Sequence, residues 1–123
     1  MILVDTSVWV DHLRRGNAAL GAALHADLVA IHPFVIGELA CGLLKSRGPV
    51  LGLLRSLTRL AAATDEEVLD FIEHRRLMGR GLGYIDVHLL AATALHGAAL
   101  WTRDKQLRRA AVEMALAHIE PAR

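Results

Sequence analysis

Short apolar runs alternate with longer amphipathic segments along most of the chain. Residues 2–5, 28–31 and 98–102 contain such runs, and they predict buried strands. The longer segments between them carry apolar residues at helical spacing. Parallel strands joined through helices need right-handed crossovers, which cover both faces of a sheet. The sequence therefore predicts an α/β fold, with a central, mainly parallel sheet in a three-layer α/β/α arrangement.

The expected helices can be placed from their apolar spacing and their start signals. Thr64 followed by Glu67 forms a capping box, which marks one helix start clearly. Gly79, Gly81 and Gly83 then interrupt the chain and predict a loop that leads to Asp86. The expected helices cover residues 7–14, 18–25, 33–44, 50–59, 64–78, 86–96 and 104–115, with weaker strand candidates at 60–63 and 116–119.

The chain has 123 residues, which predicts a single domain over residues 1–123. Its one cysteine, Cys41, excludes an intrachain disulfide, and the N-terminus lacks the pattern of a secretion signal. The longest stretch without Asp, Glu, Lys or Arg, residues 87–102, is shorter than the roughly 18 to 20 apolar residues of a membrane span. We therefore expect a cytoplasmic protein with no membrane partner.

The stretch VDTSVWVD, residues 4–11, places Asp5 directly after an apolar run. A carboxylate at the end of a buried strand loses hydration, which costs several kcal/mol unless hydrogen bonds or a cation replace the water. Either a helix N-terminus or a bound cation therefore has to satisfy Asp5.

Three more acids share this apolar or strand-terminal setting: Glu38, Asp86 and Asp104. Taken singly, Asp5 and Asp104 are also good helix N-caps, Asp86 a first-turn acid, and Glu38 a residue at an amphipathic boundary. Together, four carboxylates repel one another unless cations neutralise them. Ligation by oxygen alone favours Mg²⁺ or Mn²⁺, and one or two such ions can activate water for in-line displacement at phosphorus. This pattern predicts phosphodiester hydrolysis.

Four segments in order resemble the acidic motifs of the PIN-domain ribonucleases, most closely the VapC toxins of bacterial toxin-antitoxin pairs: VDTSVWVD, GEL (residues 37–39), YIDVHLLAA (84–92) and LWTRD (100–104). The resemblance implies a PIN-domain-like fold and an acidic groove that binds Mg²⁺ or Mn²⁺. It also implies that Asp5, Glu38, Asp86 and Asp104 are the catalytic quartet. Beside them, the hydroxyl-bearing Thr6, Ser7 and Thr102 either orient a water or a ligand carboxylate, or cap helices.

We therefore expect a metal-dependent endoribonuclease, the toxin of a type II toxin-antitoxin pair. Asp5, Asp86 and Asp104 would hold the metal, and Glu38 would bind a second ion or orient the attacking water. The resemblance also implies a homodimer and a VapB-like antitoxin, whose tail fills the groove and whose DNA-binding part gives an indirect link to DNA. The alternative is a catalytically silent PIN-like module that binds RNA or protein, and the intact quartet argues against it.

The charge pattern adds an expectation about RNA. Net charge is +1, but setting the quartet aside leaves 9 of the 13 acids against 14 bases, an excess of 5 positive charges. Twelve of those bases are arginine, which binds phosphate through two parallel hydrogen bonds. The candidate RNA-backbone contacts are Arg14, Arg15, Arg80, Arg103, Lys105, Arg108 and Arg109.

Overall fold

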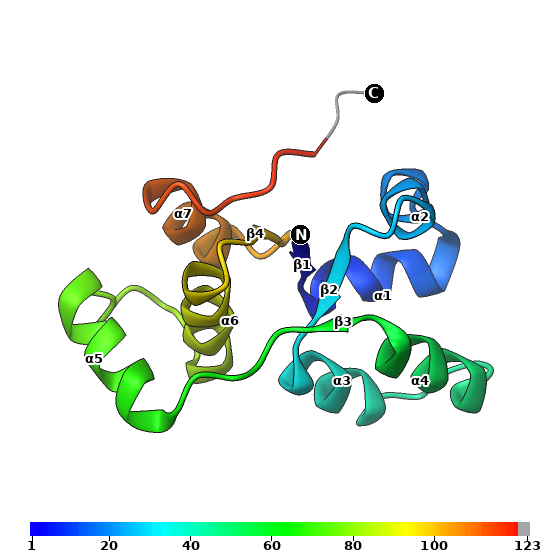
Figure 1. Cartoon of the computed structure of the whole chain (residues 1–123), viewed down its shortest axis with the longest axis horizontal. Coiled ribbons are helices and arrows are strands. Elements are labelled where there is room, and N and C mark those ends of the chain that lie inside the picture. Colours follow the sequence, from blue (N-terminus) through cyan, green and yellow to red (C-terminus); the bar gives the residue numbers. More distant parts are fainter. Residues whose placement is uncertain (121–123) are drawn as a thin grey trace.

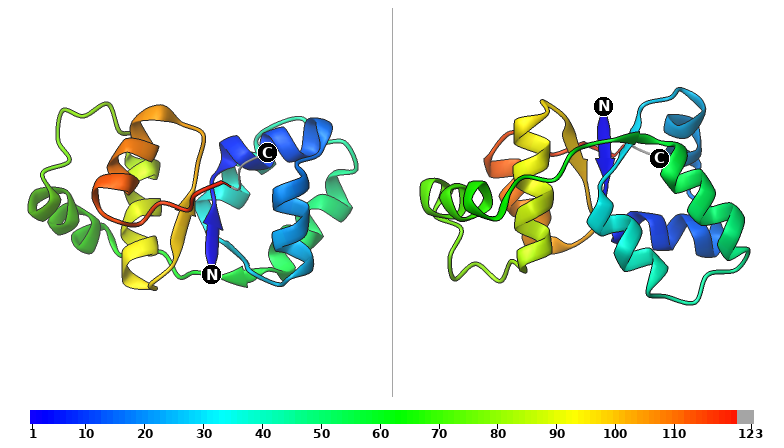
Figure 2. Two further views of the ribbon diagram at one scale, coloured as in Figure 1. Left: turned by 90° about the horizontal axis from the view of Figure 1, so that it is seen from above. Right: turned by 60° about the horizontal axis from the view of Figure 1, so that its bottom comes forward.

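A sheet of four short parallel strands forms the centre of the protein, whose computed structural model describes residues 1–120. The strands are β1 (Ile2–Val4), β2 (Val29–Ile31), β3 (Thr58–Arg59) and β4 (Ala99–Trp101), in the order β3-β2-β1-β4. All three strand pairs are parallel, and Ile2 lies opposite both Val29 and Ala99. Figure 2 shows β1 and β4 side by side in both views. The predicted parallel sheet is confirmed.

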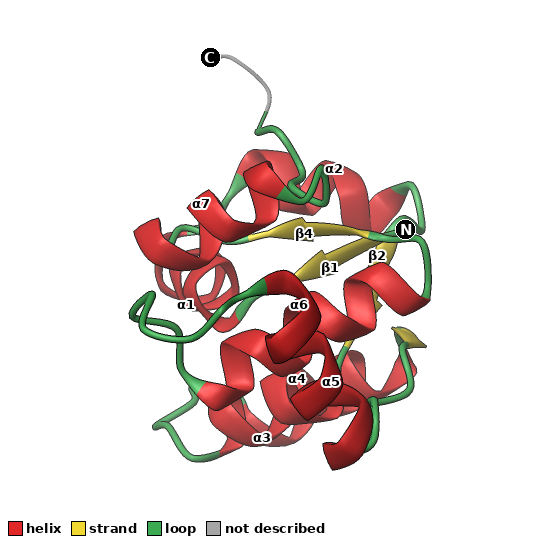
Figure 3. Ribbon diagram, turned by 90° about the vertical axis from the view of Figure 1, so that its left-hand side faces the viewer, coloured by secondary structure: helices red, strands yellow, loops and turns green. Residues whose placement is uncertain are grey.

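Helices cover both faces of this sheet. In Figure 3, α2 and α7 lie above the strands and α3 to α6 lie below them, which confirms the three-layer α/β/α arrangement. Along the sheet, α5 to α7 gather on the β4 side and α1 to α4 on the side of β2 and β3 (Figure 1). The helices are α1 (Thr6–Arg15), α2 (Ala18–His25), α3 (Pro33–Ala40), α4 (Arg47–Ser56), α5 (Asp65–Arg75), α6 (Tyr84–Leu95) and α7 (Lys105–Glu113).

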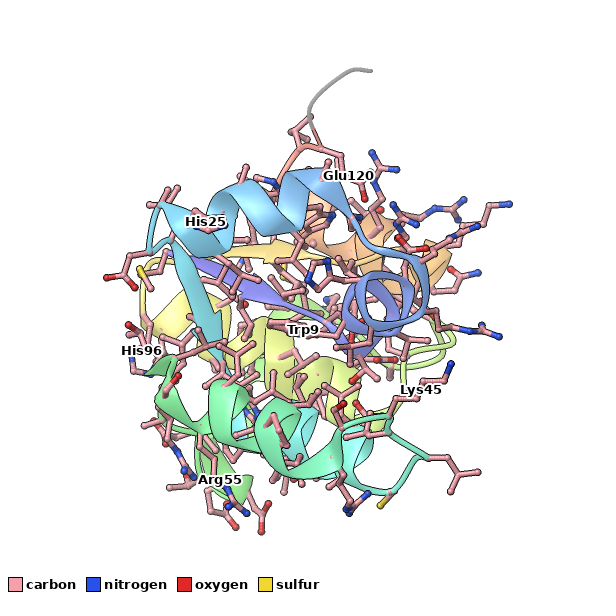
Figure 4. The ribbon with its side chains drawn as sticks, turned by 90° about the vertical axis from the view of Figure 1, so that its right-hand side faces the viewer. Trp9, His25, Lys45, Arg55, His96 and Glu120 are labelled. Carbon is pink, nitrogen blue, oxygen red and sulfur yellow. The ribbon has the colours of Figure 1, made fainter. Side chains whose placement is uncertain are left out.

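The core forms where the apolar strands meet the inner faces of the helices. Leu3 and Val4 of β1 are fully buried, as is Trp9 of α1, which lies at the centre of Figure 4. Burying each such side chain contributes about 1.5 to 3 kcal/mol. This packing holds β1 in the middle of the sheet, so the residue that follows it, Asp5, has a fixed position.

Several predicted boundaries are wrong. The helix expected over residues 33–44 ends at Ala40, because the chain turns at Gly42 and leaves Leu43 fully exposed. The helix expected from residue 50 begins at Arg47, since Pro49 falls in its first turn, where its missing N–H is tolerated. The strand expected at 60–63 lies instead at Thr58–Arg59.

The segment expected as an edge strand at 116–119 forms one bridge to β4, between Leu100 and Ala117. The Leu100 N–H donates to the Leu116 carbonyl at 2.7 Å, and the His118 N–H donates to the Leu100 carbonyl at 2.8 Å. The segment therefore covers the open edge of β4 without becoming a regular strand. Within residues 1–120, no helix has both the length and the apolar content needed to cross a membrane.

Candidate active site

Asp5 is buried at the carboxyl end of β1, with 7% of its surface exposed. Its Oδ1 accepts a hydrogen bond from the Thr6 N–H at 2.8 Å. Its Oδ2 accepts from the Ser7 hydroxyl at 2.9 Å and from the Thr102 hydroxyl at 2.7 Å. Hydrogen bonds to an ionised carboxylate offset the loss of hydration, so the structure explains how the chain tolerates this charge.

The same hydroxyls join the ends of β1 and β4. The Thr102 Oγ1 that donates to Asp5 also accepts from the Asp104 N–H at 3.0 Å. The Ser7 Oγ accepts from the Arg103 N–H at 3.0 Å. These bonds fix the backbone of the loop between β4 and α7 against the start of α1, so the position of Asp104 depends on Asp5, Ser7 and Thr102.

The other three acids come from the starts of α6 and α7 and from α3. Asp104 is the N-cap of α7, and its Oδ1 accepts from the Leu107 N–H at 2.9 Å. Asp86 closes a capping box at the start of α6, where its Oδ2 accepts from the Gly83 N–H at 2.9 Å. Glu38 is exposed on α3, and its Oε1 accepts from the Thr6 hydroxyl at 2.8 Å. Asp5 is itself the N-cap of α1, so three of the four acids cap helices: Asp5, Asp86 and Asp104.

The four carboxylates also share one electrostatic environment. Burial raises the pKa of Asp86 above its ordinary value, and the negative charges of Asp104, Asp5 and Glu38 raise it further, while the Gly83 N–H acts in the opposite direction. Repulsion from all three of the other acids requires that they lie near Asp86. The structure thus brings the predicted quartet together at the carboxyl edge of the sheet, which Figure 3 shows on its left, beside α1.

The quartet supplies only oxygen donors, the type that Mg²⁺ and Mn²⁺ prefer. Within residues 1–120, no three His, Cys, Asp or Glu side chains converge closely enough, in their present conformers, to hold a metal ion. Each acid instead keeps one oxygen or both on a neighbouring N–H or hydroxyl. The assignment of metal ligands therefore stays a prediction.

Three of the seven predicted RNA contacts form ion pairs within the chain. Arg15 and Arg103 both contact Asp11, at 2.7 and 3.0 Å, and Arg80 contacts Glu113 at 2.6 Å. The other four, Arg14, Lys105, Arg108 and Arg109, are exposed. Asp11 is a residue that the sequence reasoning missed, although its spacing of four from Arg15 on one helix could have revealed that pair.

A groove of about 730 Å³ opens beside the quartet, between α1, α3 and the loop that follows α3. Thr6 and Glu38 form its end nearest the acids, and Arg14 and Lys45 supply positive charge. Apolar side chains make up much of the rest of its lining: Val10, Leu13, Leu39, Leu43, Leu44 and Val50. A groove that combines apolar and charged side chains suits a peptide segment that carries both kinds of side chain.

Comparisons with known proteins place the chain in a family. The PIN domain family model matches residues 2–113. Ribonuclease VapC32 of Mycobacterium tuberculosis, in both strain CDC 1551 / Oshkosh and strain ATCC 25618 / H37Rv, is 50% identical over 121 residues, which cover 98% of each chain.

Two solved structures share the fold at low sequence identity. Mycobacterium tuberculosis VapC20, described as a sarcin-ricin loop cleaving toxin, has a TM-score of 0.68 at 20% identity, over 98% of this chain and all of that one. A toxin-antitoxin complex from Klebsiella pneumoniae has a TM-score of 0.64 at 22% identity, over 85% of this chain and 87% of that one. With the family match and the 50% identical relative, the chain belongs to the PIN-domain family and, within it, to the VapC proteins.

Proposed function

We propose that this protein is an Mg²⁺- or Mn²⁺-dependent endoribonuclease and the toxin of a type II toxin-antitoxin pair. One observation carries the proposal: Asp5, Glu38, Asp86 and Asp104 gather at the carboxyl edge of the sheet, where burial and the charges of the other three acids raise the pKa of Asp86. A stable fold gains nothing from unbalanced like charges, whereas a divalent cation turns the same arrangement into a binding site. The 50% identity to a protein named Ribonuclease VapC32 supports RNA as the substrate.

The hydrogen bonds of the four acids support a different role for Glu38 than for the three aspartates. Asp104 uses Oδ1, and Asp86 uses Oδ2, to cap a helix, so each keeps a second oxygen with no hydrogen-bond partner in residues 1–120. We assign Asp5, Asp86 and Asp104 to hold the ion, and Glu38 to bind a second ion or to orient the attacking water. When bound, the ion supplies the positive charge and the activated water that hydrolysis at phosphorus needs.

The proposal includes two protein partners. A VapB-like antitoxin would place its tail in the groove, which is lined by Thr6, Glu38, Arg14 and several apolar side chains. The likeness in fold to a chain of the Klebsiella toxin-antitoxin complex supports a partner of this kind. A homodimer is part of the same proposal, and DNA is reached only through the antitoxin.

Cleavage of RNA by the purified protein tests the function. We expect cuts in a structured RNA when Mg²⁺ or Mn²⁺ is present and none when EDTA is added. Expression in bacteria should arrest growth, and co-expression of the cognate antitoxin should relieve the arrest. Absence of cleavage together with absence of Mn²⁺ binding would instead favour the silent RNA- or protein-binding module.

Thr102→Val is expected to lower metal affinity and cleavage rate by roughly 10- to 100-fold, the usual effect of losing a group that orients a metal ligand. The variant removes the hydroxyl that donates to Asp5 and accepts from the Asp104 N–H. Thr93→Val is the matched control, because Thr93 is also buried, but its hydroxyl donates only to the Leu89 carbonyl of its own helix. Calorimetric titration with Mn²⁺ measures the affinity. Equal Mn²⁺ affinities in the two variants would show that Thr102 does not help to position the metal ligands.

A further inference from the structure

The glycine-rich loop before α6 faces α7 across a shallow hollow of about 560 Å³. This hollow is separate from the apolar groove and shares no lining residue with it. Its lining is polar: Gly79, Arg80, Gly81, Gln106, Arg109 and Glu113.

The loop keeps the hollow open on one side. Gly79 and Gly81 have φ angles of 70° and 74°, in the left-handed region, where a side chain is strained. Arg80 lies between them, and its guanidinium pairs with Glu113 at 2.6 Å. The pair ties the loop to α7. The charge of Arg80 therefore holds the loop in place. Because Gly79 and Gly81 have no side chains, the loop side of the hollow is formed by backbone at these two positions.

The hollow lies between the loop that leads into α6, the helix of Asp86, and α7, which follows Asp104. The loop ends at Gly83, whose N–H donates to Asp86. On the other side, α7 follows directly on its N-cap, Asp104. A polymer whose reacting phosphodiester lies at the quartet would therefore place a neighbouring unit against the loop and the first turns of α7.

The side chains that α7 offers to the hollow suit a nucleotide. Gln106 and Arg109 are three residues apart on α7, so they project from the same side of the helix. Within residues 1–120, Arg109 forms no ion pair and the Gln106 amide makes no hydrogen bond. A free guanidinium binds a phosphate, and an amide both donates to and accepts from a base edge or a 2′-hydroxyl. The lining contains no large apolar side chain to anchor a protein partner.

We propose that this hollow is an RNA subsite next to the catalytic quartet. Arg109 binds the backbone phosphate adjacent to the one that is cleaved, and Gln106 reads the base edge of the same nucleotide. The inference rests on the proposed ribonuclease function and adds to it the residues that set the preference for the nucleotide beside the cut.

Steady-state cleavage of one RNA hairpin by Arg109→Gln and Gln106→Ala tests the subsite, with Arg55→Gln as the control. Arg55 is exposed on α4, at the bottom of Figure 4, and α4 lies on the opposite side of the sheet from α7 in Figure 1. We expect Arg109→Gln to raise KM by about tenfold with kcat little changed, because a charge-assisted hydrogen bond to the substrate is lost. The slope of log affinity against log salt should fall by about 0.7 for one lost phosphate contact, while Arg55→Gln keeps the wild-type values.

A pool of hairpins randomised at the nucleotides flanking the cut tests Gln106. We expect Gln106→Ala to change the preferred flanking nucleotide while Arg55→Gln preserves it. The inference is overturned if both hollow variants match Arg55→Gln in KM, salt dependence and preference while the wild type cleaves. It is also overturned if they weaken only a complex with a partner protein. In both of these cases the ribonuclease proposal stands, whereas wild-type protein that neither binds nor cuts RNA would overturn both.

Discussion

Asp5→Asn is expected to lower metal-dependent RNA cleavage by at least roughly 100-fold, since losing even a group that orients a metal ligand costs 10- to 100-fold. Asp5 is the most buried of the four acids and receives three hydrogen bonds that fix its position. Replacing one carboxylate oxygen with an amide nitrogen removes the negative charge of Asp5, which is assigned to bind the ion. The ratio of kcat/KM values for wild type and variant, with Mn²⁺ and a structured RNA, measures the loss.

The fold should survive this change, which keeps the result interpretable. The Asn carbonyl can still accept from the Thr6 N–H, and the hydroxyls of Ser7 and Thr102 have lone pairs that can accept from the new NH₂ group. We expect the free energy of unfolding without metal to change by no more than about 1 kcal/mol. Asp70→Asn is the matched control, because Asp70 is an exposed aspartate on α5. Wild-type cleavage by Asp5→Asn would show that the quartet is not the active site.

Asp86→Asn is expected to have opposite effects on stability without and with metal. In the metal-free protein the variant should be more stable than wild type at neutral pH, because it removes a carboxylate whose pKa is raised by burial and by three neighbouring acids. The cap at α6 remains, since an Asn carbonyl can accept from the Gly83 N–H. With Mn²⁺ the order should reverse, because only the wild type keeps all three carboxylates that are assigned to hold the ion.

The pH dependence follows from the direction of that shift. The folded-state pKa of Asp86 lies above its unfolded-state value, so at low pH, where both states are protonated, the group costs nothing. As pH rises from the unfolded-state pKa through the folded-state pKa, ionisation of Asp86 lowers the free energy of unfolding of the metal-free wild type. Asp86→Asn has no ionisable group at this position, so its free energy of unfolding does not show this decrease.

Thermal melts of both proteins, with EDTA and with Mn²⁺ over a range of pH, measure these effects on stability. Mn²⁺ at 100 times its dissociation constant should stabilise the wild type by about 2.7 kcal/mol. A variant that is less stable than wild type in EDTA, and that gains as much from Mn²⁺, would contradict metal binding at Asp86.

Most of the sheet could be predicted from the sequence, for a physical reason. β1, β2 and β4 are buried on both faces, so each is a continuous apolar run that stands out beside the helices. β3 is different, because both of its residues, Thr58 and Arg59, are exposed. It is a strand because it pairs with β2 at the edge of the sheet. The sequence of residues 58–59 contains no apolar pattern that could predict this pairing.

The quartet could be found because four acids interrupt apolar segments, but the sequence could not show how each would be satisfied. For Asp5, Asp86 and Asp104, the sequence alone allows both a role as a helix cap and a role in the active site. The caps are present in the structure, and they leave oxygens available at Asp86 and Asp104. The ion pairs of Arg80 with Glu113 and of Arg103 with Asp11 could not be predicted from the sequence, because the partners lie far apart along the chain.

The most direct test asks which group attacks the phosphorus. The RNA to use is one that the wild type cuts at a single site, compared with the same RNA carrying one 2′-deoxyribose at the cut nucleotide. If carboxylate-bound metal activates water, both RNAs are cleaved to linear phosphate ends, and EDTA stops both reactions. If the deoxy substrate resists, and the natural one yields a 2′,3′-cyclic phosphate even in EDTA, the RNA's own hydroxyl is the nucleophile. The four carboxylates would then not form a metal-dependent nuclease site.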